Sequence, residues 1–256
     1  MKIHATAVVD AAAELAAGVE VGPYAVIAGP VRLGAGTTVG AHAVIEGRTT
    51  LGPGCRVFPH AVLGTIPQDL KYAGEDTTLE VGAGTTFREF VSCNRGTRAA
   101  GATRIGGGCL LMAYAHVAHD CVLSDGVVLA NCATLAGHVD VGEYASVGGL
   151  AAIHQFTRIG RYAYIGGMGR ISQDVIPYGL VRADPTKVVG INVIGLKRRG
   201  FAPEVLEALR RAYHILFREE LNTSQALAKM KTELGGIAEV EELIAFVNNS
   251  ERGILK

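Results

Sequence analysis

The chain has 256 residues and carries 24 Lys and Arg against 24 Asp and Glu, so its net charge is zero with neutral histidines. This balance argues against nucleic acid as a partner, because such binding requires excess positive charge. The sequence has no run of 18 apolar residues and no basic-then-apolar leader, so we expect a cytoplasmic protein. Its five cysteines form no CxxC pair, which predicts reduced thiols rather than disulfides or metal ligands.

From Ile3 to Ile171 an apolar or small residue recurs at every sixth position, and only Asp69 and Glu75 break the series. This period is too long for simple strand alternation and does not fit a helix, so it predicts a short strand and a turn, repeated. Three of these units complete one triangular coil, which places Tyr24, His42 and His60 in one column. The pattern therefore predicts a parallel β-helix of hexapeptide repeats. Other hexapeptide proteins are left-handed, and we expect the same hand here.

Two polar segments interrupt the repeat. The first runs from Ile66 to Thr78 and spans both failed positions. We expect it to leave the coil as a loop that is either a solvated decoration or a ligand contact through Asp69 and Lys71. The second runs from Asn94 to Arg104, is basic and rich in Gly and Ala, and is expected to be a solvated excursion.

Residues 105–176 resume the repeat and contain a group of histidines. Adding 18 to His119 gives Gly137, and adding 18 again gives Gln155, so these positions lie on successive coils. Asp120 follows His119 directly, and a carboxylate beside an imidazole suits a general base. A zinc site is the competing interpretation, although no closed ligand set can be identified. The histidines concerned are His116, His119, His138 and His154.

Beyond Pro177 the six-residue period ends. We predict a β-helix over residues 1–190 and a C-terminal α-helical domain over residues 191–256. The apolar pattern predicts a helix from about Pro203 and further helices at about 224–234 and 237–249, with Thr223 and Ser224 as candidate caps. A cationic run, Lys197–Arg199, lies in the segment that joins the two parts.

Six segments together resemble one known family. They are QDLKYAGE at 68–75, NRGT at 94–97, AHVAHDC at 115–121, TLAGHV at 134–139, IHQF at 153–156 and GLKRRGF at 195–201. In this order they resemble the UDP-N-acetylglucosamine acyltransferases of lipid A biosynthesis, along essentially the whole chain. The resemblance implies transfer of a 3-hydroxyacyl chain from acyl carrier protein to the 3-hydroxyl of UDP-N-acetylglucosamine. It also implies a homotrimer with active sites between neighbouring subunits, and we expect neither a metal nor a cofactor.

The resemblance assigns roles by matching motifs. His119 would be the general base, Asp120 its orienting partner, and the Gly137 N–H the donor to the oxyanion of the intermediate. Gly167 and Met168 fall where the family measures acyl-chain length. The residues expected to bind sugar, pyrophosphate, acyl chain, nucleotide or carrier protein are Asp69, Lys71, His116, His138, His154, Gln155, Asn192, Arg198 and Arg199.

Two positions depart from the family pattern, since Asn94 replaces a frequent His and Ile194 a frequent Glu. They leave open a 3-amino variant of the sugar nucleotide as the acceptor. The sequence also leaves open a metal-dependent lyase of the carbonic anhydrase type, a non-catalytic scaffold, and the N-acyltransferase of the same pathway. The last has a separate N-terminal uridine-binding domain, which we do not find before the repeats.

Overall fold

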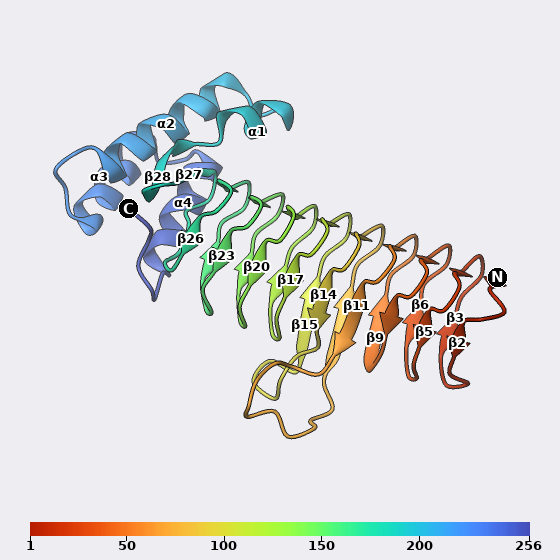
Figure 1. Cartoon of the computed structure of the whole chain (residues 1–256). Helices are drawn as coiled ribbons and strands as arrows, with labels where there is room; N and C mark the ends of the chain where they lie inside the picture. Colours follow the sequence, from red (N-terminus) through yellow and green to blue (C-terminus); the bar gives the residue numbers. More distant parts are fainter.

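The computed structural model describes all 256 residues. The coils stack into a long prism with the N-terminus at one end, and the helices gather at the other end (Figure 1). The prism is a left-handed parallel β-helix with three sheets, A, B and C, as the sequence predicts.

Short strands, most of two residues, form the three sheets. Sheet A holds β1 (Lys2–Ile3), β4 (Glu20–Val21), β7 (Thr38–Val39), β10 (Arg56–Val57), β13 (Thr86–Phe87), β16 (Leu110–Leu111), β19 (Val128–Leu129), β22 (Ser146–Val147), β25 (Tyr164–Ile165), β27 (Gly179–Ala183) and β28 (Thr186–Ile191). Sheet B holds β2 (Val8–Val9), β5 (Val26–Ile27), β8 (Val44–Ile45), β11 (Val62–Thr65), β14 (Ser92–Asn94), β17 (His116–Val117), β20 (Thr134–Leu135), β23 (Ala152–Ile153) and β26 (Arg170–Ile171). Sheet C holds β3 (Glu14–Leu15), β6 (Arg32–Leu33), β9 (Arg48–Leu51), β12 (Thr78–Val81), β15 (Ala102–Ile105), β18 (Val122–Leu123), β21 (Asp140–Val141) and β24 (Arg158–Ile159).

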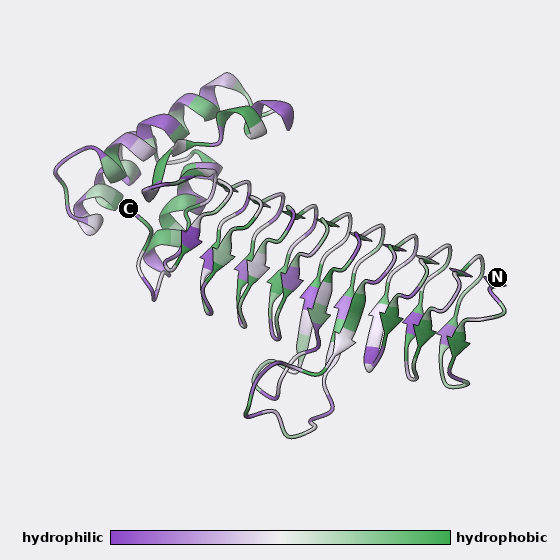
Figure 2. Cartoon of the chain, in the orientation of Figure 1, coloured by the Kyte–Doolittle hydropathy of each residue, from purple (hydrophilic) through white to green (hydrophobic).

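The second residue of nearly every strand points into the prism, because strand side chains alternate between two faces. Val26, Val44 and Val62 pair in register from one coil to the next, as predicted. Strands such as β3 and β6 show one polar and one apolar residue (Figure 2). The buried members form a continuous core that extends into the helices. Burial of these stacked side chains is the main stabilising contribution to the coil.

Residues with positive φ turn the chain at the three corners of the prism. At the A–B corner, five aromatic and imidazole rings stack with centroids 4.8–5.1 Å apart. The A–B corner column is Tyr24, His42, His60, Phe90, Tyr114, Cys132, Leu150 and Met168; the B–C corner column is Asp120, His138 and Phe156; the C–A corner column ends in Tyr144, Tyr162 and Tyr178. The column predicted from the regular coil spacing is therefore confirmed.

The two interruptions leave the prism at the B–C corner, where they lie next to one another (Figure 1). Arg48 pairs with Thr78 instead of position 66, where a regular coil would return, so this coil is longer by two repeat units. Thr78 pairs with Ala102 instead of position 96, so the next coil is longer by one repeat unit. The first interruption loops out as predicted. Ala99 keeps the six-residue count, at which side chains are expected to point inward, but it lies in the exposed turn of the excursion.

The expectation that the whole segment from Asn94 to Arg104 is solvated was wrong. Asn94, Thr97, Ala102 and Thr103 are buried. The segment begins and ends as strands β14 and β15, and only its central turn faces solvent. Polar side chains tolerate such burial only when they are hydrogen-bonded, so this segment must be held by specific contacts with its neighbours.

At the C-terminal end the antiparallel pair β27–β28 extends sheet A, and four helices follow. They are α1 (Val193–Arg198), α2 (Pro203–Phe217), α3 (Thr223–Leu234) and α4 (Ala238–Asn248). Helix α3 is capped by Asn222 with Gln225 in a capping box, so the predicted caps were placed one or two residues too late. The predicted division at residues 190 and 191 remains a proposal. None of the helices has the length and apolar character needed to cross a bilayer.

We predict that Gly64→Ala destabilises the protein far more than Gly36→Ala. Both glycines have positive φ, which costs Ala about 1–2 kcal/mol. A Cβ at Gly64 would also lie 1.9 Å from Thr49 Oγ1 and 2.2 Å from the Glu46 carbonyl oxygen, whereas Gly36 has open space. Overpacking adds roughly 1–3 kcal/mol.

Urea unfolding followed by circular dichroism measures both variants. The expected loss is roughly 2–5 kcal/mol for Gly64→Ala and about 1–2 kcal/mol for Gly36→Ala. Equal midpoints for the two variants would contradict the tight packing around Gly64.

Candidate active site

The B–C corner collects most of the residues that the sequence predicts for the site. His119 and Asp120 turn the chain between β17 and β18, and His138 turns it one coil later. The His138 N–H donates to the His119 carbonyl at 3.0 Å, which stacks the two turns. Asp120 and His138 both have φ close to 60°, a region that Asp and His enter more readily than most residues.

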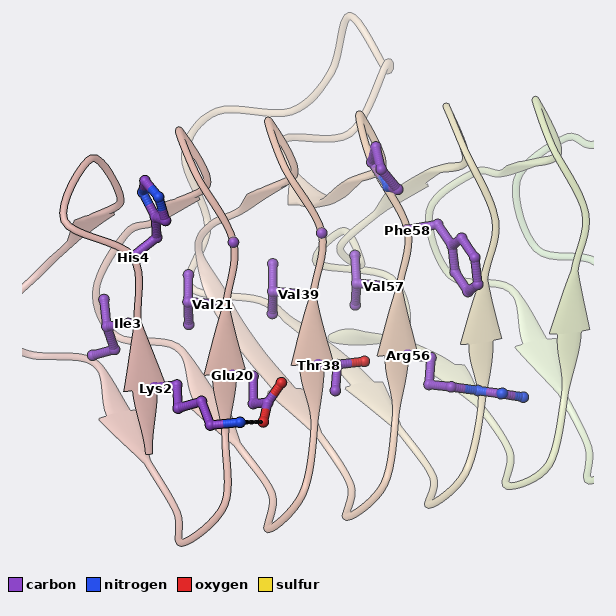
Figure 3. A pocket seen from close by; sticks show the side chains of 13 residues that line it. Lys2, Ile3, His4, Glu20, Val21, Thr38, Val39, Arg56, Val57 and Phe58 are labelled. Carbon is purple, nitrogen blue, oxygen red and sulfur yellow. Dashed lines mark hydrogen bonds and ion pairs between the residues drawn. The ribbon is translucent and has the colours of Figure 1, made fainter.

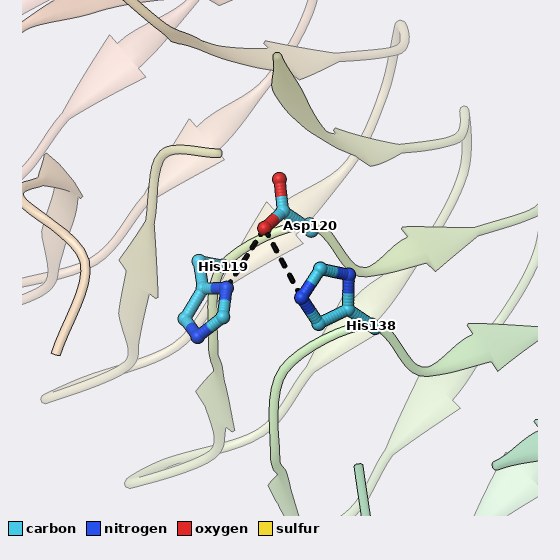
Figure 4. A group of neighbouring side chains, drawn as sticks. All are labelled: His119, Asp120 and His138. Carbon is cyan, nitrogen blue, oxygen red and sulfur yellow. Dashed lines mark hydrogen bonds and ion pairs between the residues drawn. The ribbon is translucent and has the colours of Figure 1, made fainter. Parts of the chain in front are cut away.

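His119 and Asp120 form a hydrogen-bonded pair (Figure 4). His119 Nδ1 lies 2.8 Å from Asp120 Oδ2. An ionised carboxylate only accepts hydrogen bonds, so Nδ1 carries the proton and Nε2 keeps its lone pair. The His119 side chain is 14% exposed and that of Asp120 is 0% exposed. The pair therefore consists of a buried carboxylate and a partly exposed imidazole whose Nε2 can accept a proton.

Gly137 lies directly against the imidazole of His119. A Cβ at this position would meet the ring at 2.5 Å, so only glycine leaves room for His119. The Gly137 N–H makes no hydrogen bond within the chain. A free backbone donor beside a basic nitrogen is the arrangement expected of an oxyanion-binding group.

Asp120 is ionised at neutral pH despite its burial. Desolvation would raise the pKa of its carboxyl group, but hydrogen bonds from Thr97 and His119 outweigh this effect and hold the pKa below its usual value. The Thr97 N–H donates to Oδ1 at 2.8 Å and the Thr97 hydroxyl to Oδ2 at 2.6 Å. Thr103 Oγ1 accepts the Asp120 N–H at 2.8 Å. The turn and the carboxylate are thus fixed from both sides.

His138 approaches the same carboxylate oxygen from the next coil. Its Nε2 lies 3.5 Å from Asp120 Oδ2, and its ring packs edge-on against His119 (Figure 4). The same ring stacks on Phe156. The ligand atoms of His119, Asp120 and His138 lie within 4.8 Å of one another. The spacing fits a divalent cation, although two short hydrogen bonds already occupy Oδ2.

His116 lies on the strand before this pair, and His154 and Gln155 lie two coils further along. The outward-facing His116 on β17 accepts or donates a 2.7 Å hydrogen bond with Ser92. Burial lowers the pKa of His116, so its ring stays neutral to more acidic pH. His154 and Gln155 are exposed and lie beyond β23, where His154 Nδ1 is 3.3 Å from Arg252.

The loop after β11 carries Asp69 and Lys71 at the same corner. Asp69 Oδ1 accepts the backbone N–H of Lys71 at 3.0 Å, and the Lys71 side chain is exposed. Asn94 holds the base of the loop, because its amide donates to Thr65 Oγ1 and to the Ile66 carbonyl. Its burial and these bonds give Asn94 a structural role in the position where the family often has His.

Arg95 fixes the same loop further out. Its guanidinium donates to the Tyr72 hydroxyl at 2.9 Å and to the Gly64 carbonyl at 3.3 Å. The two residues that open the NRGT segment therefore anchor the loop whose side chains are predicted to bind the substrate.

Asn192, Arg198 and Arg199 lie elsewhere, in a cavity of about 690 Å³ at the C–A corner. Asn192 caps α1 by accepting the Gly195 N–H, and its amide donates to the Tyr162 carbonyl. The Arg199 guanidinium lies 3.8 Å from the ring centroid of Tyr144. A cavity with two exposed arginines and several tyrosines suits an anionic ligand with a planar ring. Ile194, 67% exposed, lies in the same lining.

Gly167 and Met168 occupy the third corner. They turn the chain at the A–B corner, and Met168 is 74% exposed. The predicted site residues of one chain therefore fall on three corners, and the B–C corner alone brings together the proposed base, its carboxylate and the oxyanion donor.

A separate groove of about 610 Å³ lies on sheet A near the N-terminus (Figure 3). Lys2 and Glu20 form an ion pair there at 2.9 Å. None of the predicted site residues lines this groove.

The sequence patterns gave no role to Thr97 or Ser92. Thr97 belongs to the NRGT motif that carries the resemblance, and this motif was the one signal that pointed to it. Its contact with Asp120 depends on a 23-residue separation that does not match the regular coil. Ser92 pairs with His116 across a similar irregular coil.

Two family models match the chain. One, described as Udp N-acetylglucosamine O-acyltransferase, Domain 2, matches residues 174–255. The other, Bacterial transferase hexapeptide (six repeats), matches residues 12–47 and 102–137. The acyl-[acyl-carrier-protein]–UDP-N-acetylglucosamine O-acyltransferase of Thiobacillus denitrificans is 49% identical over 255 residues and covers 99% of each chain. That of Anaeromyxobacter dehalogenans is 48% identical, with 100% of each chain covered.

Solved structures of similar proteins share the fold along the whole chain. The UDP-N-acetylglucosamine O-acyltransferase of Moraxella catarrhalis has a TM-score of 0.96 at 37% identity, with 100% of each chain covered. That of Bacteroides fragilis has a TM-score of 0.96 at 38% identity, with 99% of each chain covered. With relatives so similar along its full length, the chain belongs to the UDP-N-acetylglucosamine O-acyltransferase family.

Proposed function

We infer that this chain transfers a 3-hydroxyacyl group from acyl carrier protein to the 3-hydroxyl of UDP-N-acetylglucosamine, the first step of lipid A biosynthesis. The acyl-ACP-dependent reaction is the one for which its full-length relatives are named. The observation that carries the inference to particular residues is the pair of His119 with the buried Asp120 beside the free Gly137 N–H.

The proposed mechanism begins with proton transfer. His119 Nε2 takes the proton of the sugar 3-hydroxyl as its oxygen attacks the thioester carbonyl carbon. Asp120 holds Nδ1–H and stabilises the imidazolium that forms. The carbonyl oxygen becomes an oxyanion, to which the Gly137 N–H donates. The intermediate then loses the thiolate of the carrier, which takes the proton from His119, and the ester remains on the sugar.

The surrounding polar groups suit an anionic sugar nucleotide. Lys71 and Asp69 lie on the anchored loop that leaves the prism at the B–C corner, and His116, His138, His154 and Gln155 lie on the coils that follow. We propose that these side chains orient the sugar and the acyl carbonyl. Arg198, Arg199 and Asn192 would bind the nucleotide end or the acidic carrier protein.

The acyl chain is proposed to cross the outer face of sheet B. The outward side chains of β20 and β23 are small, Thr134 and Ala152. The path ends at Gly167 and Met168 on the A–B corner, where the exposed Met168 side chain would limit chain length. A bulky residue at the end of an apolar path excludes longer chains by steric contact.

We also propose a homotrimer. The cavity of Arg198 and Arg199 and the base His119 lie on different corners of one prism. Neighbouring copies that lie side by side would bring these two corners together. The A–B corner column supports such contact, because it exposes a continuous apolar row that includes Phe90, Tyr114 and Leu150. That the oligomer has three subunits follows from the resemblance. Three identical head-to-tail interfaces would close a ring of three subunits.

Other functions receive less support. A metal-dependent lyase would use the His119, Asp120 and His138 group, but the full-length relatives carry the name of an acyltransferase. The alternative of a 3-amino sugar nucleotide as acceptor depends on the departures at Asn94 and Ile194. The Asn94 amide already donates to Thr65 and Ile66 of its own chain, so it is less suited to contact an acceptor. The predicted cytoplasmic location is supported by five unpaired thiols, which are typical of a reducing compartment.

His119→Ala is expected to lower kcat by roughly 10²–10⁴-fold without unfolding the protein, because His119 supplies general-base catalysis and its ring lies outside the apolar core. Mass spectrometry of the product, with a panel of 3-hydroxyacyl carrier proteins, measures the loss. UDP-N-acetylglucosamine and its 3-amino analogue serve as alternative acceptors. Near-normal turnover by folded His119→Ala would refute the base assignment. If the wild-type protein transferred no acyl group with any combination of donor and acceptor, the proposed function would be refuted.

Charge reversal by Arg198→Glu and Arg199→Glu should raise KM for at least one substrate by tenfold or more, because two anion-binding groups become repulsive. Arg32→Glu, on an exposed N-terminal strand, is the control for a change of surface charge. Steady-state kinetics with each substrate varied separately provides the comparison. KM values equal to those of Arg32→Glu for both substrates would remove these arginines from the site.

Phe90→Glu should separate the trimer, because it places a charge in the exposed A–B corner column. Sedimentation equilibrium is expected to give three times the 26.7 kDa chain mass for the unchanged protein and a lower mass for the variant. Val122→Glu, on the outer face of sheet C, is the matched control. An unchanged protein that sediments as a monomer would reject the homotrimer, and a trimeric Phe90→Glu would reject this contact surface.

A further inference from the structure

Thr97 makes two of the hydrogen bonds that hold the Asp120 carboxylate. Its N–H donates to Oδ1 at 2.8 Å and its hydroxyl to Oδ2 at 2.6 Å. The Thr97 side chain lies in the buried interior, since the residue is only 8% exposed. It reaches Asp120 from the excursion between β14 and β15, and it lies outside every group of residues assigned so far to substrate binding.

The direction of the Thr97 hydroxyl is fixed. The Ala99 N–H donates to Thr97 Oγ1 at 3.2 Å, so the hydroxyl proton points to the carboxylate. The Gly101 N–H donates to the Thr97 carbonyl at 2.7 Å, which closes the turn. Gly96 allows this close packing, because a Cβ there would lie 2.4 Å from the Ala102 nitrogen. The excursion therefore presents Thr97 as a rigid bidentate donor.

Two imidazoles compete for one oxygen of Asp120. His119 Nδ1 lies 2.8 Å from Oδ2, and His138 Nε2 lies 3.5 Å from the same atom. The Thr97 hydroxyl and His119 together use the hydrogen-bonding capacity of Oδ2, and the Thr97 N–H prevents rotation of the carboxylate by binding Oδ1. Without the hydroxyl, Oδ2 is free to accept from His138.

We propose that Thr97 is a positioning residue, which commits the Asp120 carboxylate to His119 rather than to His138. The inference rests on the proposed function, since it assumes that His119 is the base. Thr97 touches neither substrate and acts only through Asp120. The excursion that carries it thus belongs to the catalytic apparatus, and its solvent-exposed turn is only the outer part.

The test is kinetic. Thr97→Val keeps the shape and the N–H but removes the hydroxyl, and it should lower kcat on the order of ten- to a hundredfold, the range expected for a hydrogen bond to a charged group. KM for both substrates should stay within about twofold. Thr97→Ser restores the donor and should recover most of the loss. Thr37→Val, which removes another buried hydroxyl on an N-terminal coil, should leave kcat unchanged.

A double-mutant cycle separates positioning from general destabilisation. Asp120→Gly removes the carboxylate and tolerates the positive φ of that position. In this background Thr97→Val should change the residual kcat by less than about twofold, because its route of action is gone. Should Thr97→Val melt below the assay temperature, Thr97→Ala takes its place under the same criteria.

Three results would overturn the inference while the unchanged enzyme remains active. They are kcat of Thr97→Val within twofold of the unchanged enzyme, a loss that Thr97→Ser does not recover, and an equal loss with and without the Asp120 side chain. Absence of transfer by the unchanged protein would instead overturn the proposed function, and this inference with it.

Discussion

The fold depends on one constraint, the register in which each strand pairs with its counterpart one coil later. Parallel pairing fixes the distance between coils and the direction of every side chain at once. A residue placed on a corner therefore meets its counterparts from the coils above and below, however far apart they are in sequence. The stacked rings from Tyr24 to Tyr114 and the contact of His119 with Gly137 both follow from this register.

The same constraint explains how much the sequence could predict. The six-residue period indicated the prism, its inward positions and the neighbourhood of His119, Gly137 and His138, because these follow the regular coil spacing. Prediction failed where a coil has a different length. Ala99 keeps the numerical period but lies in an exposed turn, and Thr97 meets Asp120 across an irregular coil. The predicted cap of α3 was also wrong, because Asn222 caps the helix rather than Thr223 or Ser224.

The two irregular coils supply polar side chains beside the active-site corner. The longer coils add Thr97, which donates to Asp120, and Asn94 and Arg95, which donate to the loop beside that corner. Burial of a carboxylate is unfavourable unless several donors compensate for lost water. Here the regular coil supplies His119 and Asp120, and Thr97 from the second interruption supplies two hydrogen bonds that help to keep the carboxylate ionised.

The last strands of sheet A have a consequence for self-assembly. A stack of parallel strands has open hydrogen-bonding edges at both ends, and repetition of the same contact would build a fibre. The chain reverses at β27 and β28, and the helices follow at that end. Sheet A therefore does not continue its parallel stacking at the helical end, which blocks growth of the parallel coil there by the first coil of another molecule.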